Sequence, residues 1–235
     1  MNTNREIVSL TNVIKNYGHG EVITKALQGI DLKIIQGDFS VVMGPSGCGK
    51  STMLNIIGGL DKTTSGEVKF DGKDFNSLSN KELSIIRRNQ IGFVFQNYNL
   101  LPVLTAYENA EYVLMLQEMP VSQRKEKVMH FFKEMGLDGL ENRLPRELSG
   151  GQQQRVAIAR AVVSDPLLVL ADEITANVDS ETAQSLLLLM EKLNKINKTT
   201  FLISTHDPAV IKFAKKVIVL KDGRIDKEEL SSENI

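Results

Sequence analysis

The stretch GPSGCGKST, residues 44–52, decides the fold of this 235-residue chain. It follows the apolar run FSVVM and opens a segment, 50–57, that has the pattern of a helix. From Gly44 to Ser51 it meets every fixed position of the phosphate-binding pattern G-x-x-x-x-G-K-[ST]. Glycines here let the backbone wrap so closely that successive N–H groups and the positive end of a helix face phosphate oxygens. The stretch therefore predicts a nucleotide site built on a strand, a loop and a helix.

The residues of this phosphate loop are assigned to the nucleotide and its metal ion. Lys50 is expected to reach the β- and γ-phosphates, and the Ser51 hydroxyl to ligate Mg²⁺. An ordinary glycine turn before a helix is the alternative, and the presence of both residues disfavours it. Cys48 is interpreted as a variable loop position and not as a reactive thiol. The predicted nucleotide-binding residues are Gly44, Pro45, Ser46, Gly47, Cys48, Gly49, Lys50, Ser51 and Thr52.

Two acidic residues supply the hydrolytic half of the site. The run PLLVLADE, residues 166–173, is almost continuously apolar before its last two positions, as expected of a parallel strand covered on both faces. Asp172 then stands at a strand end, where a carboxylate can hold the Mg²⁺ shell, and Glu173 points toward the water that attacks the γ-phosphate. An acidic pair after an apolar run is weak evidence alone, but here it follows a matched phosphate loop. The sequence thus predicts that the nucleotide is hydrolysed.

Composition and charge exclude several classes of function. Hydrophobic residues make up 42% of the chain, which is enough to bury a full core. The 28 basic and 29 acidic residues nearly cancel, so we expect no nucleic-acid partner. The N-terminus, MNTNREIVSL, has no apolar signal core, and the densest apolar run, LLLLM, is too short to cross a bilayer. We therefore expect a cytoplasmic protein unless a partner tethers it to a membrane.

The order of the predicted elements is that of an α/β fold. Short β-rich pieces between Ile7 and Asp38 indicate a small antiparallel layer that leads into the strand FSVVM. The run IGFVFQ, residues 91–96, is predicted to be an apolar strand that ends on Gln96. A capping box at Ser79 starts a predicted helix before this strand. From residue 97 to 164 the pattern is helical, with a second capping box at Thr105.

A second glycine-rich stretch, LSGGQQQR at 148–155, opens a helix rich in small apolar residues. Ser149 and Gln152 have the spacing of an ordinary capping box. Local spacing does not separate this interpretation from a second one, in which the helix start binds an anion with its amides and hydroxyl. The two glycines favour anion binding, because a capping box does not need them.

At these two glycine stretches the sequence resembles the nucleotide-binding subunits of ATP-binding cassette (ABC) transporters over residues 6–225. The resemblance implies that two copies pair head to tail as a homodimer. Each ATP then lies between the phosphate loop of one copy and the LSGGQ of the other, so that Ser149, Gly150, Gly151 and Gln152 bind the partner's ATP. ATP and Mg²⁺ are the implied cofactors.

Four further positions take their roles from the same resemblance. Gln96 matches the glutamine that touches Mg²⁺ and senses the membrane partner, and His206 the switch histidine that bonds the γ-phosphate. Asp179 matches the aspartate of the loop that crosses the dimer interface, although it also has the position of a helix N-cap. Tyr17 resembles the aromatic residue that stacks on adenine, with His19 close by as an alternative. Gln96, Glu173 and His206 are thus the predicted catalytic residues, and Ser51, Gln96 and Asp172 the predicted metal ligands.

The resemblance also implies a domain plan. We predict a P-loop NTPase fold with a RecA-like core, an N-terminal antiparallel β subdomain and an inserted α-helical subdomain. The whole chain, 1–235, is one nucleotide-binding domain. Within it, 1–96 and 165–225 form the β subdomain and core, 97–164 the helical subdomain, and 226–235 a loose acidic tail.

One position departs from the family pattern. The family usually has a proline after the catalytic glutamate, and Ile174 stands there in this chain. Without proline a backbone dihedral angle next to Glu173 is free, so we expect ATP turnover that is retained but altered.

The runs around both glycine stretches closely resemble the group that includes lipoprotein-releasing and macrolide-exporting ATPases (LolD and MacB types) and peptide-antibiotic resistance systems. That resemblance implies a separate transmembrane permease subunit with few spans and a large extracytoplasmic domain. The chain would then lie on the cytoplasmic face of the membrane, with the apolar stretch NLLPVLTA receiving a short helix of the permease. Two alternatives are a cell-division ATPase of the FtsE type and a cytosolic ABC ATPase without a transport role.

Overall fold

The computed structural model describes residues 5–18 and 23–230, and its strands form two sheets. The smaller sheet is antiparallel, in the order β2-β1-β4-β5. Its strands are β1 (Glu6–Tyr17), β2 (Thr24–Ile35), β4 (Ser65–Phe70) and β5 (Lys73–Asp74). The expected antiparallel layer between Ile7 and Asp38 is thereby confirmed.

The larger sheet has six strands in the order β10-β9-β3-β8-β7-β6, and all of its pairs except β10 with β9 are parallel. Parallel strands need crossover connections, and helices supply most of them here. The strands are β3 (Phe39–Met43), β6 (Ile91–Val94), β7 (Leu168–Asp172), β8 (Thr200–Thr205), β9 (Lys216–Lys221) and β10 (Arg224–Leu230).

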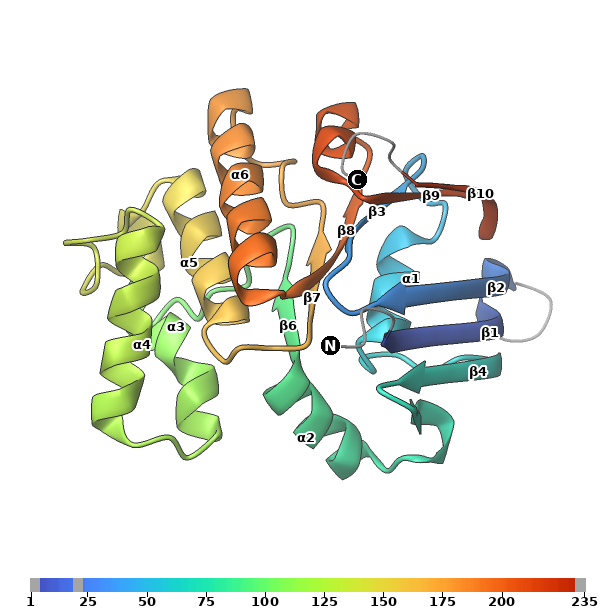
Figure 1. Cartoon of the computed structure of the whole chain (residues 1–235), viewed down its shortest axis with the longest axis horizontal. Helices are drawn as coiled ribbons and strands as arrows, with labels where there is room; N and C mark the ends of the chain where they lie inside the picture. Colours follow the sequence, from blue (N-terminus) through green and yellow to red (C-terminus); the bar gives the residue numbers. More distant parts are fainter. Residues whose placement is uncertain (1–4, 19–22, 231–235) are drawn as a thin grey trace.

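The helices divide between the two sides of the molecule (Figure 1). Helices α3, α4 and α5 stand together on one side, and the antiparallel sheet lies on the other, with α1 between it and the parallel strands. The α-helices are α1 (Lys50–Ile57), α2 (Asn80–Gln90), α3 (Ala106–Leu116), α4 (Val121–Glu134), α5 (Gly150–Val162) and α6 (Ser180–Asn197). Three short 3₁₀ segments are η1 (Phe75–Ser77), η2 (Pro145–Glu147) and η3 (Pro208–Phe213).

Helix α1 holds the two sheets together. Its side chains Met53, Leu54, Ile56 and Ile57 are buried in one core cluster with residues of the antiparallel sheet and of the central parallel strands. A second cluster lies on the other face of the parallel sheet, where α3 to α6 pack. Because α1 begins at Lys50, this packing also fixes the phosphate loop against the sheet.

Two predicted boundaries are wrong. The strand predicted over 91–96 ends at Val94, so Gln96 lies in the loop beyond it, where its side chain is exposed. The acidic tail predicted from 226 is a strand as far as Leu230, because β10 pairs with β9 and satisfies the backbone groups of what would otherwise be a sheet edge. Its acidic side chains stay exposed, and one of them, Glu228, pairs with Lys216 at 2.6 Å.

The predicted capping boxes are confirmed. Ser79 with Glu82 and Thr105 with Glu108 each exchange side-chain and backbone hydrogen bonds at the starts of α2 and α3. None of the helices in the described part of the chain has the length and apolar character that crossing a bilayer requires.

Candidate active site

The candidate site lies where the parallel strands end. Strands β3, β8 and β7 are adjacent and parallel, with β6 beside β7, so the residues that follow their carboxyl ends meet at one edge of the sheet. These residues are the phosphate loop after β3, Gln96 after β6, Glu173 after β7 and His206 after β8. Ligands in open α/β sheets bind at such an edge.

The phosphate loop leaves the start of α1 open to an anion. Gly49 is the N-cap of α1 in the left-handed region, with φ 107°, and no side chain of the described residues caps the helix. A Cβ atom at Gly49 would lie 2.5 Å from the carbonyl oxygen of Ala26, so only glycine fits here. The first amides of α1 are therefore available to phosphate oxygens.

The Lys50 side chain is buried within the phosphate loop. Its side chain is 6% exposed, and Nζ donates hydrogen bonds to the carbonyls of Gly44 at 2.8 Å and Pro45 at 3.2 Å. The same nitrogen lies 3.4 Å from Oε1 of Glu173. The loop carbonyls and one carboxylate thus hold the ammonium in place between the loop and the end of β7.

Glu173 stands at the centre of the charged groups. Its backbone lies in the left-handed region, with φ 49°, and its amide donates to the carbonyl of Ser204 at 3.0 Å. Oε2 lies 2.8 Å from Nδ1 of His206, so one carboxylate contacts a lysine and a histidine from two different strand ends. Non-glycine residues adopt this backbone region rarely, and such residues cluster at active sites.

Asp172 ends β7 behind this cluster. Its carboxylate accepts a hydrogen bond from the Ser204 hydroxyl on β8, and the two residues are paired in the sheet register. Ser51 and Gln96 line the cleft, so hydroxyl, amide and carboxylate oxygens, the ligands that Mg²⁺ prefers, lie at this end of the sheet. Three such side chains do not complete an octahedral shell, but Mg²⁺ in phosphate sites takes further ligands from phosphate oxygens and water. The donor set fits Mg²⁺ held together with a nucleotide.

A cleft of about 570 Å³ gathers most of the predicted residues. We call it the phosphate cleft, and its lining residues are Pro45, Ser46, Gly47, Gly49, Lys50, Ser51, Thr52, Gln96, Glu173 and His206. Several predicted residues do not line it: Gly44, Cys48, Asp172, Tyr17, Asp179 and the LSGGQQQR motif. Cys48 is buried beneath the loop.

Tyr17 lies at the end of β1, with its ring half exposed. Its hydroxyl donates to Asp61 at 2.7 Å, and the ammonium of Lys15 lies 4.6 Å from the ring centroid. Burial and the hydrogen bond to Asp61 raise the pKa of Tyr17. Stacking on adenine stays a prediction, and its alternative, His19, lies outside the described residues.

The LSGGQQQR motif is both a capping box and an exposed helix start. Gln152 N–H donates to the Ser149 hydroxyl at 3.3 Å, and Ser149 N–H donates to the Gln152 side chain at 2.9 Å. The capping box that the sequence left as one interpretation is therefore present. Ser149 is nevertheless exposed at the N-terminus of α5, where a second molecule can reach it.

The two glycines of this motif have a packing role that the sequence did not reveal. A Cβ atom at Gly150 would lie 3.0 Å from the Tyr98 hydroxyl, and one at Gly151 would lie 2.7 Å from Cγ2 of Thr182. The start of α5 thus packs closely against the loop after β6 and the start of α6. The glycines alone do not argue for anion binding, because these close contacts already favour a residue without a side chain.

Asp179 is the N-cap of α6. It accepts a hydrogen bond from Thr182 N–H at 2.9 Å and another from the Thr182 hydroxyl at 2.7 Å. These two hydrogen bonds lower its pKa. The capping role expected from the sequence is confirmed, and a role across an interface stays a prediction.

Sequence reasoning missed two residues that hold the loop after β6. Arg160 on α5 donates to the carbonyls of Tyr98 at 2.8 Å and Asn99 at 2.5 Å, two residues in the left-handed region. Burial lowers the pKa of Arg160. Asn177 donates from its side chain to the carbonyl of Gln96 at 2.9 Å. Both residues act on backbone carbonyls, which leave no pattern in the sequence.

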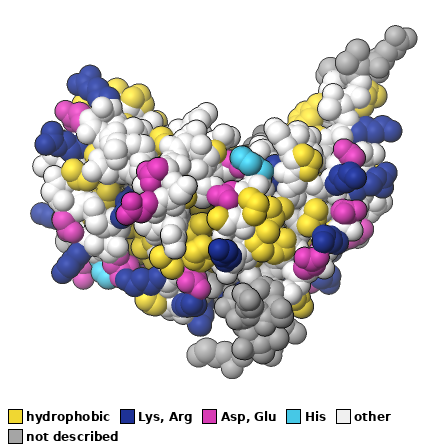
Figure 2. Space-filling model, turned by 90° about the horizontal axis from the view of Figure 1, so that it is seen from above, with side chains coloured by type: hydrophobic (Ala, Val, Ile, Leu, Met, Phe, Trp, Pro, Cys, Tyr) yellow, Lys and Arg dark blue, Asp and Glu magenta, His cyan; other side chains and the backbone are white. Residues whose placement is uncertain are grey.

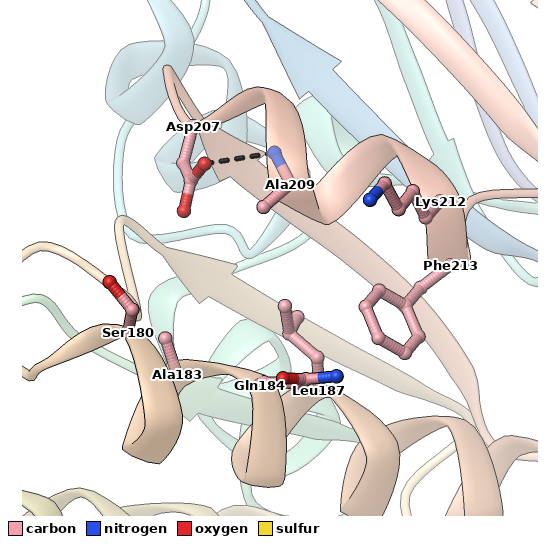
Figure 3. Close-up of a pocket in the computed structure, with 8 residues that line it drawn as sticks. All are labelled: Ser180, Ala183, Gln184, Leu187, Asp207, Ala209, Lys212 and Phe213. Atoms are coloured by element: carbon pink, nitrogen blue, oxygen red, sulfur yellow. Dashed lines mark hydrogen bonds between the residues drawn. The ribbon is translucent and has the colours of Figure 1, made fainter.

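A second groove of about 320 Å³ lies between α6 and η3 (Figure 3). It starts beside Asp179 and His206, but it contains no predicted site residue. Its lining residues are Ser180, Ala183, Gln184, Leu187, Asp207, Ala209, Lys212 and Phe213.

On the face shown in Figure 2, hydrophobic side chains gather near the centre with charged ones around them. The phosphate cleft, which holds the glycine loop and the charged residues, is the candidate active site.

Comparison with known proteins agrees with this geometry. The family model described as "ABC transporter" matches residues 27–176. MJ0796, an uncharacterized ABC transporter ATP-binding protein of Methanocaldococcus jannaschii, is 47% identical over 95% of this chain and 97% of its own length. The macrolide export ATP-binding/permease protein MacB of Marinobacter nauticus is 42% identical over 94% of this chain and 34% of its own length. A solved dimeric post-hydrolysis structure of the MJ0796 cassette with ADP and Pi matches with a TM-score of 0.90, at 46% identity, over 95% of this chain and 98% of that one.

Proposed function

Since this chain belongs to the ABC transporter family as an ATP-binding subunit that hydrolyses ATP, we propose that two copies close head to tail around two ATP molecules and drive a separate membrane permease. The observation that carries this proposal is the placement of Glu173. Its carboxylate lies in the phosphate cleft between Lys50 and His206, at the end of a strand that also carries Asp172.

Within the cleft each side chain has a distinct task. The loop amides and Lys50 bind the β- and γ-phosphates, which positions the terminal phosphate at the edge of the sheet. Glu173 accepts the proton of the attacking water as general base, and His206 orients that carboxylate through the contact at Nδ1. Ser51, Asp172 and Gln96 would hold Mg²⁺, which would neutralise developing charge on the phosphate oxygens.

The second copy completes this site with the start of its α5. Ser149 is exposed at the N-terminus of α5, and the positive end of this helix suits the terminal phosphate of an ATP bound in the other copy. The solved dimeric structures of the MJ0796 cassette support a dimer as the working form. Asp179 is exposed at the start of α6, and the proposal puts it at the same junction.

The membrane partner is proposed to bind on the helical side of the chain. Exposed apolar residues lie in the loop after β6 and on α3: Leu101, Val103, Tyr112, Met115 and Leu116. A small groove beside them is lined in part by Phe93, Phe95 and Val113. Apolar surface of this kind suits a short amphipathic helix of a permease.

The finer proposal is a permease of the MacB kind, with few spans and a large extracytoplasmic domain. It is supported by the likeness to MacB, a protein of which this chain spans about a third. The chain would then act at the cytoplasmic face of the membrane and take its cargo specificity from the permease.

The experiment that tests this function uses Glu173→Gln, which keeps the shape of the cleft and removes the general base. We expect this variant to bind ATP, to lose ATPase activity and to elute from a sizing column as a dimer at saturating ATP and Mg²⁺. Glu126→Gln, an exposed change on α4, is the control and should retain wild-type ATPase activity. A Glu173→Gln variant that stays monomeric would contradict the proposal.

A further inference from the structure

Ser204 is an unusual residue for its place in the sheet. Strand β8 lies between β3 and β7, and all six of its residues are buried. Parallel strands that are covered on both faces are typically built of valine, isoleucine and leucine. A serine in such a strand gives up apolar packing, and burying its hydroxyl costs free energy unless the hydroxyl makes a hydrogen bond. The position is therefore favourable only if the hydroxyl has a partner.

That partner is Asp172. The Ser204 hydroxyl donates a hydrogen bond to Oδ1 of Asp172, and the two residues are directly paired in the register of β7 and β8. Within residues 5–18 and 23–230, no other side chain donates a hydrogen bond to this carboxylate. Ser204 thus holds one carboxylate oxygen in place and leaves the other, Oδ2, for the Mg²⁺ shell.

The main chain of Ser204 contacts the second acidic residue of the site. Its carbonyl accepts a hydrogen bond from Glu173 N–H at 3.0 Å. Any residue at position 204 offers such a carbonyl, whereas only a residue with a side-chain donor can hold the Asp172 carboxylate. A substitution at this position therefore changes the hydrogen bond to Asp172 and keeps the one from Glu173.

We propose that Ser204 is a positioning residue that orients the Asp172 carboxylate for the Mg²⁺ shell. This proposal rests on the proposed function, in which Asp172 holds the metal ion together with Ser51 and Gln96. Groups that hydrogen-bond to metal-ligating side chains fix their orientation, and losing one typically weakens metal affinity or activity by about 10- to 100-fold. The serine gives up packing in the sheet and supplies that hydrogen bond.

A second buried serine offers a matched control. Ser40 on β3 is fully buried, like Ser204, and its hydroxyl has no hydrogen-bond partner among the described residues. It is paired with Leu202 of β8, so it lies in the same sheet and next to the same strand. Ser40→Ala therefore removes a buried hydroxyl without changing the contacts of a carboxylate.

The test measures the affinity for AMP-PNP, a non-hydrolysable ATP analogue, by calorimetry with Mg²⁺ and with EDTA. The ratio of the two affinities is the gain that the metal ion supplies. We expect Ser204→Ala to reduce this gain by about tenfold, the lower end of the range for such hydrogen bonds. Its affinity in EDTA should stay within about twofold of the wild type, because the phosphate loop is unchanged. Ser40→Ala should match the wild type under both conditions.

A pair of variants at position 204 separates the hydroxyl from its packing. Threonine and valine have nearly the same shape, and only threonine can donate a hydrogen bond. Ser204→Thr and Ser204→Val thus add similar bulk to the same buried space. We expect Ser204→Thr to keep most of the gain from Mg²⁺ and Ser204→Val to lose it as Ser204→Ala does. A purely structural role of Ser204 would affect both variants equally.

The possible results distinguish this proposal from the proposed function. An equal gain from Mg²⁺ in Ser204→Ala and the wild type would overturn the positioning role, and so would equal losses in Ser204→Thr and Ser204→Val. A Ser204→Ala variant that loses as much affinity in EDTA as in Mg²⁺ would also overturn it, since the damage would then extend to the whole cleft. If the wild type itself gains no affinity from Mg²⁺, the metal site of the proposed function fails as well.

Discussion

Oε1 of Glu173 lies 3.4 Å from Nζ of Lys50, so the proposed general base and the proposed phosphate-binding lysine are ion-pair partners on the same chain. Both side chains are largely removed from solvent, with 13% and 6% exposed. Because little water reaches them, the positive charge of Lys50 and the negative charge of Glu173 compensate each other. A phosphate that binds this ammonium competes with the Glu173 carboxylate for it.

This competition predicts that Glu173→Gln binds nucleotide more tightly than the wild type. The amide leaves Lys50 free of its carboxylate partner, so affinity for ADP should rise about two- to fivefold, the range of a single ion pair. ADP is the suitable ligand because it is not hydrolysed. Isothermal titration calorimetry measures the affinity, and Glu126→Gln should bind ADP as the wild type does. Unchanged affinity in Glu173→Gln would mean that the ion pair does not restrain Lys50.

Two substitutions at Ser149 separate its capping role from its proposed role toward phosphate. Ser149→Asp keeps a good N-cap, so the free energy of unfolding should stay close to wild type while the added negative charge suppresses ATPase activity. Ser149→Ala loses the cap and should cost about 1 kcal/mol of stability. Denaturant unfolding and ATPase rates measure the two effects. Full activity in Ser149→Asp would show that Ser149 is a cap and nothing more.

The departure at Ile174 predicts a mild phenotype for Ile174→Pro. The Glu173 carbonyl accepts a hydrogen bond from Ala176 N–H at 3.1 Å, which places Ile174 at the second position of a turn, where proline is favoured. The lost side chain is buried, so we expect a loss of about 1 to 2 kcal/mol in unfolding free energy. ATPase activity should change by less than about tenfold, a shift of less than 1.4 kcal/mol in the barrier. Identical ATPase rates in the wild type and Ile174→Pro would mean that the absence of proline has no effect on turnover. Complete inactivity of Ile174→Pro would contradict the placement of residue 174 at the second position of a turn.

The cap at Asp179 predicts a pH dependence. Hydrogen bonds from Thr182 lower the pKa of Asp179 in the folded chain, so its ionised form stabilises the fold above about pH 4, the ordinary range of the group. That stabilisation is lost as pH falls through the lowered pKa. Asp179→Asn caps the helix but does not titrate. The melting temperature of the wild type should therefore exceed that of Asp179→Asn at neutral pH, with the difference shrinking in acid. A difference that is constant from pH 7 to pH 3 would contradict this.

The sequence predicted those parts of the fold and site that depend on local chemistry. Glycines with Lys50 and Ser51 fixed the phosphate loop, and the capping boxes gave correct helix starts. Such features depend on residues within a few positions of one another, so a single stretch reveals them.

Features that depend on distant segments escaped prediction. Residues 226–230 continue β10 because they pair with β9, whereas acidic side chains alone suggested a loose tail. Arg160 and Asn177 serve backbone carbonyls that lie 60 or more positions away in the chain, which no spacing encodes. The packing of Gly150 and Gly151 against Tyr98 and Thr182 belongs to the same class.

The most direct measurement of the central claim, a site shared between two copies, is the ATPase rate of a mixture of two inactive variants. Lys50→Ala removes the proposed phosphate-binding lysine from the cleft of its chain, and Ser149→Arg blocks the α5 start that is proposed to serve the partner. A mixed dimer then holds one site built from two intact halves. We predict that each variant alone is inactive and that an equal mixture recovers up to about a quarter of the wild-type rate, since half of the dimers are mixed and each has one working site of two. A mixture with no more activity than its separate components would contradict the account.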